Sequence, residues 1–501
     1  MRMESTEDIK EDISSIISKE EINNNLKINR WVCLALYSIV ASVATFVHSG
    51  FSGWQPIIFK TGAFKELCTP DDEVQIFRVD ANITYESCGN RDAAVNNLST
   101  LSFFVHFFLS FSSGYILDTY GEKVCFLCGQ TILTAAFLSL ILFKVSYIWY
   151  VFFFLLGVSA DLSFIPLLKI SKFFPGKESL IFGILGSARS TGFAIGLVLK
   201  LVFFYTFNFK DDEFYILCIF YILTCSMYSL IIGIFIMPGK SEDISHLNSE
   251  GATGSSVTDK NHVGVLNEME SLESIEKKNK KDVNETFGEK LRRLWSHPKK
   301  WEYLLVVFIC SSNMIRFDYF IKTNRSFFIW RTYDLTTIFS LLTILSFIPS
   351  PFFGYIAGKF GSVYGILINN IFVLLTYIFV LFDSVYLRAV SILLFFFFIS
   401  FAFSCFYCYV DEKYSKEHFG KLCGLMFAVS ALCLVVNFYL TYLTNVVYVY
   451  LGEKKQIPVT IGLIILGLIT ILGCIYLKIS ERVIEKEFVP EKKKIVDIQQ
   501  N

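Results

Sequence analysis

Long apolar stretches recur along this chain, separated mostly by short polar connections. A bilayer core about 30 Å thick requires roughly 20 consecutive apolar residues for one helical crossing, and about twelve stretches of the chain meet that length. With 53% hydrophobic and 17% aromatic residues, the chain is more apolar than a soluble core requires. The sequence therefore predicts an all-α polytopic membrane protein of twelve transmembrane helices. The predicted spans are 31–59, 98–117, 124–143, 147–168, 180–207, 214–237, 301–321, 335–357, 363–382, 387–410, 422–450 and 457–477.

Polar segments divide these spans into two groups of six. Residues 1–30 are polar and lack the short apolar core of a cleavable signal peptide, so we expect a tail there. Residues 238–300 are rich in Ser, Glu, Lys and Asn, a composition that buries too little apolar surface to order a chain. We interpret this segment as a disordered linker between bundles at 31–237 and 301–477; a folded soluble insert is the alternative. Residues 478–501 form a second tail.

The distribution of Lys and Arg predicts the orientation in the membrane. Basic residues concentrate in the connections on the same side as the N-terminus, and the positive-inside rule places that side in the cytoplasm. Both termini are then cytoplasmic, and the loop 60–97 is external. This loop contains Cys68 and Cys88, and an external loop permits oxidation. We expect a disulfide between them.

A short turn between the second and third spans carries a motif. It reads GYILDTYGEK from Gly114 to Lys123, and Gly114, Asp118, Gly121 and Lys123 resemble the G-x-x-x-D-x-x-G-x-[RK] signature of the major facilitator superfamily. The resemblance implies two six-helix bundles joined by a cytoplasmic linker. A related turn, GYIAGKFGSVYG, begins at Gly354 in the second half, as an internal repeat would require, although glycine replaces the aspartate there.

The residue types of this turn suggest a gate. Gly114 and Gly121 would let helices approach and the backbone turn tightly. Asp118, at a membrane surface, could face a helix N-terminus or a basic residue of the opposite bundle and so latch the inner gate. The alternative is a solvated turn whose lysine, Lys123, only follows the positive-inside rule.

The first span and the loop after it carry a second resemblance. The stretch SGFSGWQPIIFKTGAFKELC, from Ser49 to Cys68, resembles the first-helix signature of the system L-type amino-acid facilitators and the related apicomplexan amino-acid transporters. That resemblance implies amino acids as the substrate class. A zwitterion needs a cation or donors for its carboxylate and an anion or acceptors for its ammonium group.

Few charges lie inside the spans, and a charge at the bilayer centre costs roughly 2.5 to 3.5 kcal/mol. Asp161 and Arg189 stand at similar depth and are expected to pair, as a structural ion pair or as part of a substrate site. Asp318 and Lys322 are four residues apart and share a helix face, while Arg316 points elsewhere. Local pairing is the alternative to a substrate role for Asp318, and snorkelling to the interface is the alternative for Lys322.

Small and polar residues interrupt the first span. Ser49, Gly50, Gly53 and Trp54 are candidates for substrate binding, because glycines and a nearby proline free backbone groups that can line a cavity. Close helix packing through the glycines is the alternative.

Three further residues are candidates for roles inside the bundles. Tyr407 in the tenth span is a candidate lining residue of the second bundle. His48 and His106 could relay protons or be hydrogen-bonded structural histidines.

No enzyme motif is found, since the sequence has no nucleophile elbow, phosphate-binding glycine loop or clustered metal ligands. We therefore expect a transporter that works by alternating access in the plasma membrane. Asp161 and Asp318 lie in spans of opposite bundles and could replace the water of a cationic side chain, so the expected substrates are cationic amino acids. If Arg189 and Lys322 already neutralise these carboxylates, a neutral amino acid fits better. The alternatives are a large neutral amino-acid facilitator, a sugar or organic-anion carrier, and a non-transporting receptor or assembly protein. The expected partners are a small-molecule substrate and the lipid bilayer, with no cofactor, metal or nucleic acid. Ion coupling and oligomeric state are open at this point.

Overall fold

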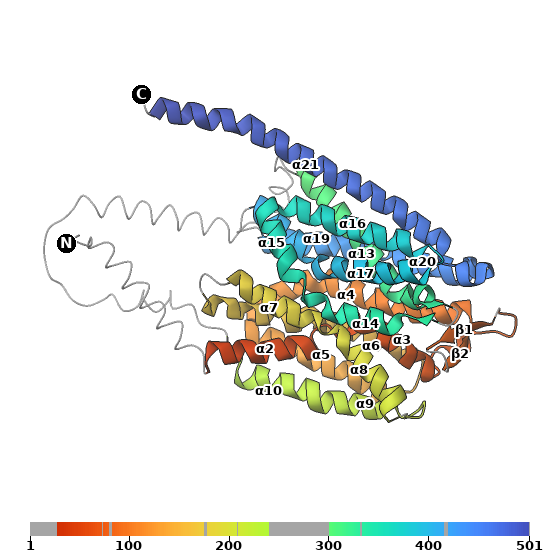
Figure 1. The fold of residues 1–501 in the computed structure, drawn as a ribbon. Helices are drawn as coiled ribbons and strands as arrows, with labels where there is room; N and C mark the ends of the chain where they lie inside the picture. Colours follow the sequence, from red (N-terminus) through yellow and green to blue (C-terminus); the bar gives the residue numbers. More distant parts are fainter. Residues whose placement is uncertain are drawn as a thin grey trace, which may run out of the picture. The chain divides into compact units, whose positions relative to one another are not determined.

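The computed structural model describes residues 28–72, 74–79, 83–174, 178–207, 209–239, 300–330, 333–414 and 419–499. The described residues are mostly helical (Figure 1). The predicted linker lies almost wholly outside this range, as does nearly all of the N-terminal tail. Residues 307–499 belong to the same compact unit as the described helices of the first half.

The described residues of the first half contain nine α-helices, several of which join end to end into one span. Their bounds are α2 Arg30–Ala44, α3 Phe51–Lys60, α4 Gly89–Tyr120, α5 Glu122–Leu142, α6 Ile148–Leu168, α7 Glu178–Ser190, α8 Phe193–Leu201, α9 Phe214–Tyr221 and α10 Met227–Phe235, with the 3-10 turn Val47–Gly50 between α2 and α3.

The second half repeats this pattern of long and joined helices. Their bounds are α13 Lys300–Phe328, α14 Thr336–Ile344, α15 Ser350–Phe360, α16 Ser362–Val380, α17 Val385–Phe401, α18 Ser404–Lys413, α19 Phe419–Leu434, α20 Val436–Tyr442 and α21 Ile457–Gln499.

In the described residues, ten helical spans are long and apolar enough to cross a membrane, and up to twelve if each of two bent pairs counts as one span. One bent pair is Arg30–Ala44 with Val47–Lys60, which meet at 44°, and the other is Thr336–Phe347 with Phe352–Phe360. The predicted fold class is confirmed.

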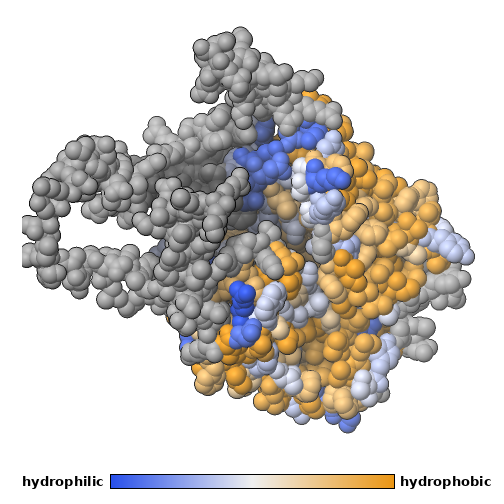
Figure 2. Space-filling model, turned by 60° about the vertical axis from the view of Figure 1, so that its left-hand side comes forward, coloured by the Kyte–Doolittle hydropathy of each residue, from blue (hydrophilic) through white to orange (hydrophobic). Residues whose placement is uncertain are grey.

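Apolar side chains cover much of the surface in Figure 2, where they appear orange. Leu142, Phe235 and Leu472 are each about two-thirds exposed, at 69%, 65% and 66%. A water-soluble protein would bury such residues, whereas lipid tails solvate them. The outer faces of these helices are therefore suited to contact lipid.

Two predicted span boundaries are wrong, and for one physical reason. Helix α4 begins at Gly89 instead of residue 98, and α13 continues to Phe328 instead of ending at residue 321. Each extension contains a cation that has buried partners. Arg91 donates to the carbonyl oxygens of Phe59, Ala63 and Glu86, and Arg325 donates to that of Val79. Charge alone therefore does not end a helix here.

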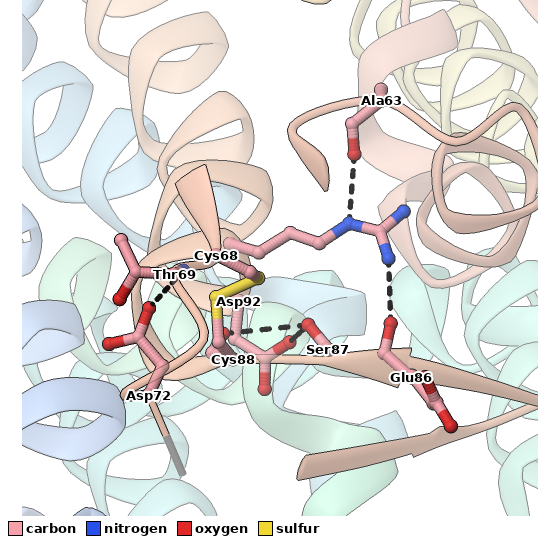
Figure 3. Close-up of a disulfide and its surroundings, with 9 residues drawn as sticks. Ala63, Cys68, Thr69, Asp72, Glu86, Ser87, Cys88 and Asp92 are labelled. Atoms are coloured by element: carbon pink, nitrogen blue, oxygen red, sulfur yellow. Dashed lines mark hydrogen bonds between the residues drawn. A yellow bond between two sulfur atoms is a disulfide. The ribbon is translucent and has the colours of Figure 1, made fainter. Parts of the chain in front are cut away.

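The loop before α4 folds back on itself (Figure 3). Strands β1 Gln75–Arg78 and β2 Thr84–Ser87 pair antiparallel, and a disulfide joins Cys68 to Cys88 at the start of α4. The predicted disulfide is confirmed. In the second half a shorter hairpin, β3 Ile329–Trp330 with β4 Tyr333–Asp334, follows α13.

The two related turns have the same backbone form in both halves. Gly121 separates α4 from α5 with a φ of 87°, and Gly361 separates α15 from α16 with a φ of 96°. Residues with a Cβ rarely adopt such a backbone angle, which explains why glycine occupies both positions. The internal repeat expected from the sequence is therefore present at this turn.

Candidate functional site

A buried ionic cluster lies in the first half. Nη2 of Arg189 on α7 lies 2.7 Å from Oδ1 of Asp161 on α6, so the predicted pair is confirmed. The aspartate side chain is 9% exposed and the arginine side chain 19%. The guanidinium carbon of Arg189 lies 4.9 Å from the ring centre of Phe46 and 4.2 Å from that of Phe164. Both distances are within the range of cation–π interactions, so the two rings stabilise the guanidinium group.

His106 on α4 is the third member of this cluster. Its Nε2 lies 3.0 Å from Oδ1 of Asp161 and 2.7 Å from Nη2 of Arg189. Phe107 stacks on His106 with ring centres 4.5 Å apart, and it reaches Phe403 and Phe427 of the second half at 5.2 and 5.7 Å. The cluster therefore lies next to the interface between the halves.

A second buried cluster joins the two halves directly. The carboxylate of Asp318 on α13 accepts hydrogen bonds from Ser99 and Thr100 on α4, both at 2.7 Å, and from Asn437 on α20 at 2.9 Å. Nζ of Lys322 lies 3.3 Å from the same carboxylate. Asp318 is fully buried, so these donors replace the water that its charge would otherwise need.

Lys322 is part of this cluster and does not snorkel. It is only 1% exposed, and its Nζ donates to Oγ1 of Thr100 and to the carbonyl oxygen of Asn437. The snorkelling interpretation is therefore wrong, and the local pairing of Lys322 with Asp318 is confirmed.

One face of α4 presents residues to both clusters. Ser99 and His106 are seven residues apart, which is two helical turns or roughly 10 Å along the axis. Phe103 lies between them on the same helix and contacts Phe317 of α13 and His48 of the first span, at 5.3 and 5.0 Å between ring centres. An aromatic layer thus separates the two ionic clusters.

The interrupted first span contributes backbone and packing contacts. Oγ of Ser49 donates to the carbonyl oxygen of Phe46, and the indole N–H of Trp54 donates to that of Val47 at 3.0 Å. Trp54 is fully buried among aromatic rings, including Phe152 at 5.3 Å. The structure does not bring Ser49 or Trp54 into hydrogen-bond contact with Asp161 or Arg189.

The glycines of this span pack against α8. A Cβ on Gly50 would lie 2.8 Å from the carbonyl oxygen of Phe193, and one on Gly53 would overlap the backbone of Gly196. Contacts this close need glycine on both helices. The packing alternative therefore explains Gly50 and Gly53, and a substrate role for them stays a prediction.

Arg316 lies apart from both clusters, whereas Tyr407 on α18 is close enough to Asp161 and Arg189 to interact with both electrostatically. Arg316 is fully buried in the second half, where its guanidinium donates to the side chains of Asn313, Asn370 and Thr470. It points away from Asp318, as its spacing along the helix predicts. The ring of Tyr407 on α18 lies 5.0 Å from that of Phe427. Their roles toward a substrate stay predictions.

The predicted gate turn is described only in part. A Cβ on Gly114 would meet no atom within 4 Å, so no close helix approach explains that glycine. Lys123 donates to the carbonyl oxygen of Ile234 on α10, within the first half. The side chain of Asp118 lies outside the described residues, and the latch stays a prediction.

The chain matches the family model described as Major Facilitator Superfamily over residues 76–436. It belongs to the major facilitator superfamily. Among curated relatives from Toxoplasma gondii, it is 29% identical to "Amino acid transporter 6-1", covering 79% of this chain and 70% of the relative. It is 28% identical to "Arginine transporter 1" from the same organism, covering 84% and 82%. "Cationic amino acid transporter 8" of Plasmodium berghei is 25% identical, with 80% of each chain covered.

Solved structures of the superfamily share the fold. The nucleoside transporter NupG superimposes with a TM-score of 0.59 at 10% identity, covering 90% of this chain and 100% of that one. The peptide transporter PepTSo does so with a TM-score of 0.55 at 15% identity, covering 90% and 98%. As a major facilitator, this protein is an integral membrane carrier and not an enzyme.

Proposed function

We propose that this protein moves amino acids across the plasma membrane by alternating access, and that its substrates are cationic amino acids such as arginine and lysine. The relatives named for arginine and for cationic amino acids support this, since each aligns with about four-fifths of the chain, 84% and 80%. The observation that carries the proposal is the Asp161–Arg189 pair beside the interface between the halves.

The chemistry of this pair suits an amino acid. Arg189 can bind a carboxylate with two parallel hydrogen bonds, and Asp161 can accept from an ammonium or guanidinium group. Without substrate, the two residues satisfy one another. The guanidinium of a substrate arginine is chemically the same group as that of Arg189, so it can take the place of Arg189 on Asp161 while Arg189 turns to the substrate carboxylate.

Neither buried aspartate is free to bind a cationic side chain as the sequence predicts. Arg189 neutralises Asp161, and Lys322 neutralises Asp318. A neutral amino acid with its side chain among the phenylalanines is therefore the second candidate. A relative named for aromatic and large neutral amino acids, also from Toxoplasma gondii and 24% identical, supports it.

Alternating access assigns a role to the Asp318 cluster. We place both termini in the cytoplasm, so the cluster closes the external side by tying α4 to α13 and α20. Its hydrogen bonds would break when that side opens, and Asp118 would latch the opposite side in that state. Substrate would then enter between the halves and reach Asp161 and Arg189.

Competition between substrates tests the proposal. Uptake of labelled arginine and labelled leucine is measured in vesicles that contain only this protein, with the wild type and with Asp161→Asn. We expect arginine uptake by the wild type, inhibited by lysine, and at least a tenfold loss in the variant. Leucine uptake without arginine uptake would support the neutral candidate. Uptake of sugars or organic anions alone, or no transport at all, would contradict amino-acid transport.

A further inference from the structure

His106 contacts both members of the Asp161–Arg189 ion pair through the same ring nitrogen, Nε2. Three atoms form a triangle, in which Nη2 of Arg189 lies 2.7 Å from Nε2 of His106 and 2.7 Å from Oδ1 of Asp161. The third side, from Nε2 to Oδ1, measures 3.0 Å. All three distances are within hydrogen-bond range.

These three contacts cannot all be hydrogen bonds at once. A guanidinium only donates, an ionised carboxylate only accepts, and one imidazole nitrogen does either but not both. If Nε2 carries no proton, it accepts from Arg189 and stands against Asp161 as acceptor against acceptor. If Nε2 carries a proton, either in the neutral Nε2–H tautomer or in the imidazolium, it donates to Asp161 and faces Arg189 as donor against donor. The proton on Nε2 therefore decides which partner His106 binds.

We propose that Nε2 of His106 is a proton-binding site, and that one proton moves with each substrate through the Asp161–Arg189 pair. The proposal rests on the proposed function as an amino-acid carrier. A protonated His106 becomes the ionic partner of Asp161 and repels Arg189. Arg189 then shares the single carboxylate of Asp161 with a second cation. The carboxylate of an incoming amino acid supplies the missing negative charge in a medium where an uncompensated charge is costly. Proton and substrate thus favour each other's binding.

Few titratable groups lie near His106 in the described part of the chain. The titratable groups that face it are Asp161 from α6, Arg189 from α7 and His48 from the first span, whose ring centre is 5.1 Å away. From the second half, the rings of Phe403 and Phe427 approach it through Phe107. The phenol of Tyr407 on α18 is a further titratable group nearby, and it interacts electrostatically with Asp161 and Arg189. His106 is 2% exposed.

His48 provides a matched control. It is a fully buried histidine beside the same cluster, and neither of its ring nitrogens has a hydrogen-bond partner in the described part of the chain. It therefore shares the burial and aromatic surroundings of His106 but not its contacts with Asp161 and Arg189.

The test uses the full chain in liposomes, with the membrane potential held at zero by potassium and valinomycin. Labelled arginine is the probe, replaced by leucine if arginine is not carried. An inward gradient of one pH unit should drive up to about tenfold accumulation if one proton accompanies each substrate. In His106→Gln, whose amide cannot bind an extra proton, accumulation should fall to the level without a gradient. In His48→Gln, gradient-driven accumulation should persist.

The outcomes separate this proposal from the function on which it rests. Exchange of labelled for unlabelled substrate without any response to the pH gradient would overturn proton coupling while leaving amino-acid transport intact. Undiminished accumulation in His106→Gln, or equal loss in His48→Gln, would overturn the assignment to His106. If His106→Gln does not exchange at all, proton uptake on adding substrate decides, measured with a pH-sensitive dye on detergent-solubilised wild type. No uptake would refute the site.

Discussion

At the scale of single residues, Asp161 and Arg189 depend on each other for burial. Each would be an uncompensated charge inside the first half if the other were neutral, and such losses typically cost about 3–5 kcal/mol. We expect Asp161→Asn and Arg189→Gln each to lower the free energy of unfolding in detergent micelles by that order. The double variant should recover part of the loss. Strictly additive effects in a double-mutant cycle would show that the pair is not coupled.

Gly53 packs directly against the backbone of α8, and this contact can be tested by substitution. A methyl group there would overlap the backbone of Gly196, and overpacking of this kind costs about 1–3 kcal/mol or more. Gly53→Ala should therefore lower the melting temperature in detergent. Gly186→Ala on α7 is the matched control, because a Cβ there meets no atom within 4 Å and alanine favours a helix. Equal melting temperatures for both variants would contradict the packing role.

Some residue contacts followed from the sequence and others could not. The Asp161–Arg189 pair was predictable because helix rise places the two residues at the same depth, and because an unpaired charge inside a bilayer is costly. Helix rise gives the depth of His106 but not the direction of its side chain, because packing sets the rotation of α4 about its axis. The contacts of His106 with Asp161 and Arg189 were therefore not predictable. The same reasoning also could not find Arg316 bound only by neutral side chains in the described residues.

At the scale of elements, α4 links the two ionic clusters. Asp318→Asn would remove the charge that holds Ser99, Thr100 and Lys322 together, so the contact between α4 and α13 should weaken. We expect spin labels on the disulfide-bearing side of the two halves to show a larger share of long distances. Asp383→Asn is the control, because its carboxylate is 66% exposed and bound only loosely by Arg388 at 3.5 Å. An unchanged distance distribution in Asp318→Asn would argue against a gate.

Element boundaries show where hydropathy is informative. The interruption of the first span was predictable from its glycines and proline, and the structure bends the chain just before them. The early start of α4 was not predictable, because a charged residue such as Arg91 normally indicates a loop outside the membrane. Its carbonyl partners, which allow its burial in the helix, are known only from the structure. The two turns at Gly121 and Gly361 were recognisable from the motif alone.

At the scale of the whole molecule, the motif at Gly114–Lys123 and its repeat pointed to the superfamily, and the family model confirms it. The substrate depends on contacts that no sequence pattern specifies. Aspartates in spans suggested a cationic substrate, yet pairing with Arg189 and Lys322 removes their net charge. We therefore expect specificity to depend on how a substrate exchanges with Arg189 and Lys322.

Counterflow is the most direct measurement of the central claim, that this chain is an amino-acid carrier. Purified protein is reconstituted into liposomes loaded with unlabelled arginine and diluted into a trace of labelled arginine, and liposomes loaded with leucine are diluted into labelled leucine in parallel. An alternating-access carrier predicts a transient accumulation of label above the external concentration in liposomes that contain its own substrate. Equilibration without overshoot under both loads, or no entry of label at all, would contradict amino-acid carriage by alternating access.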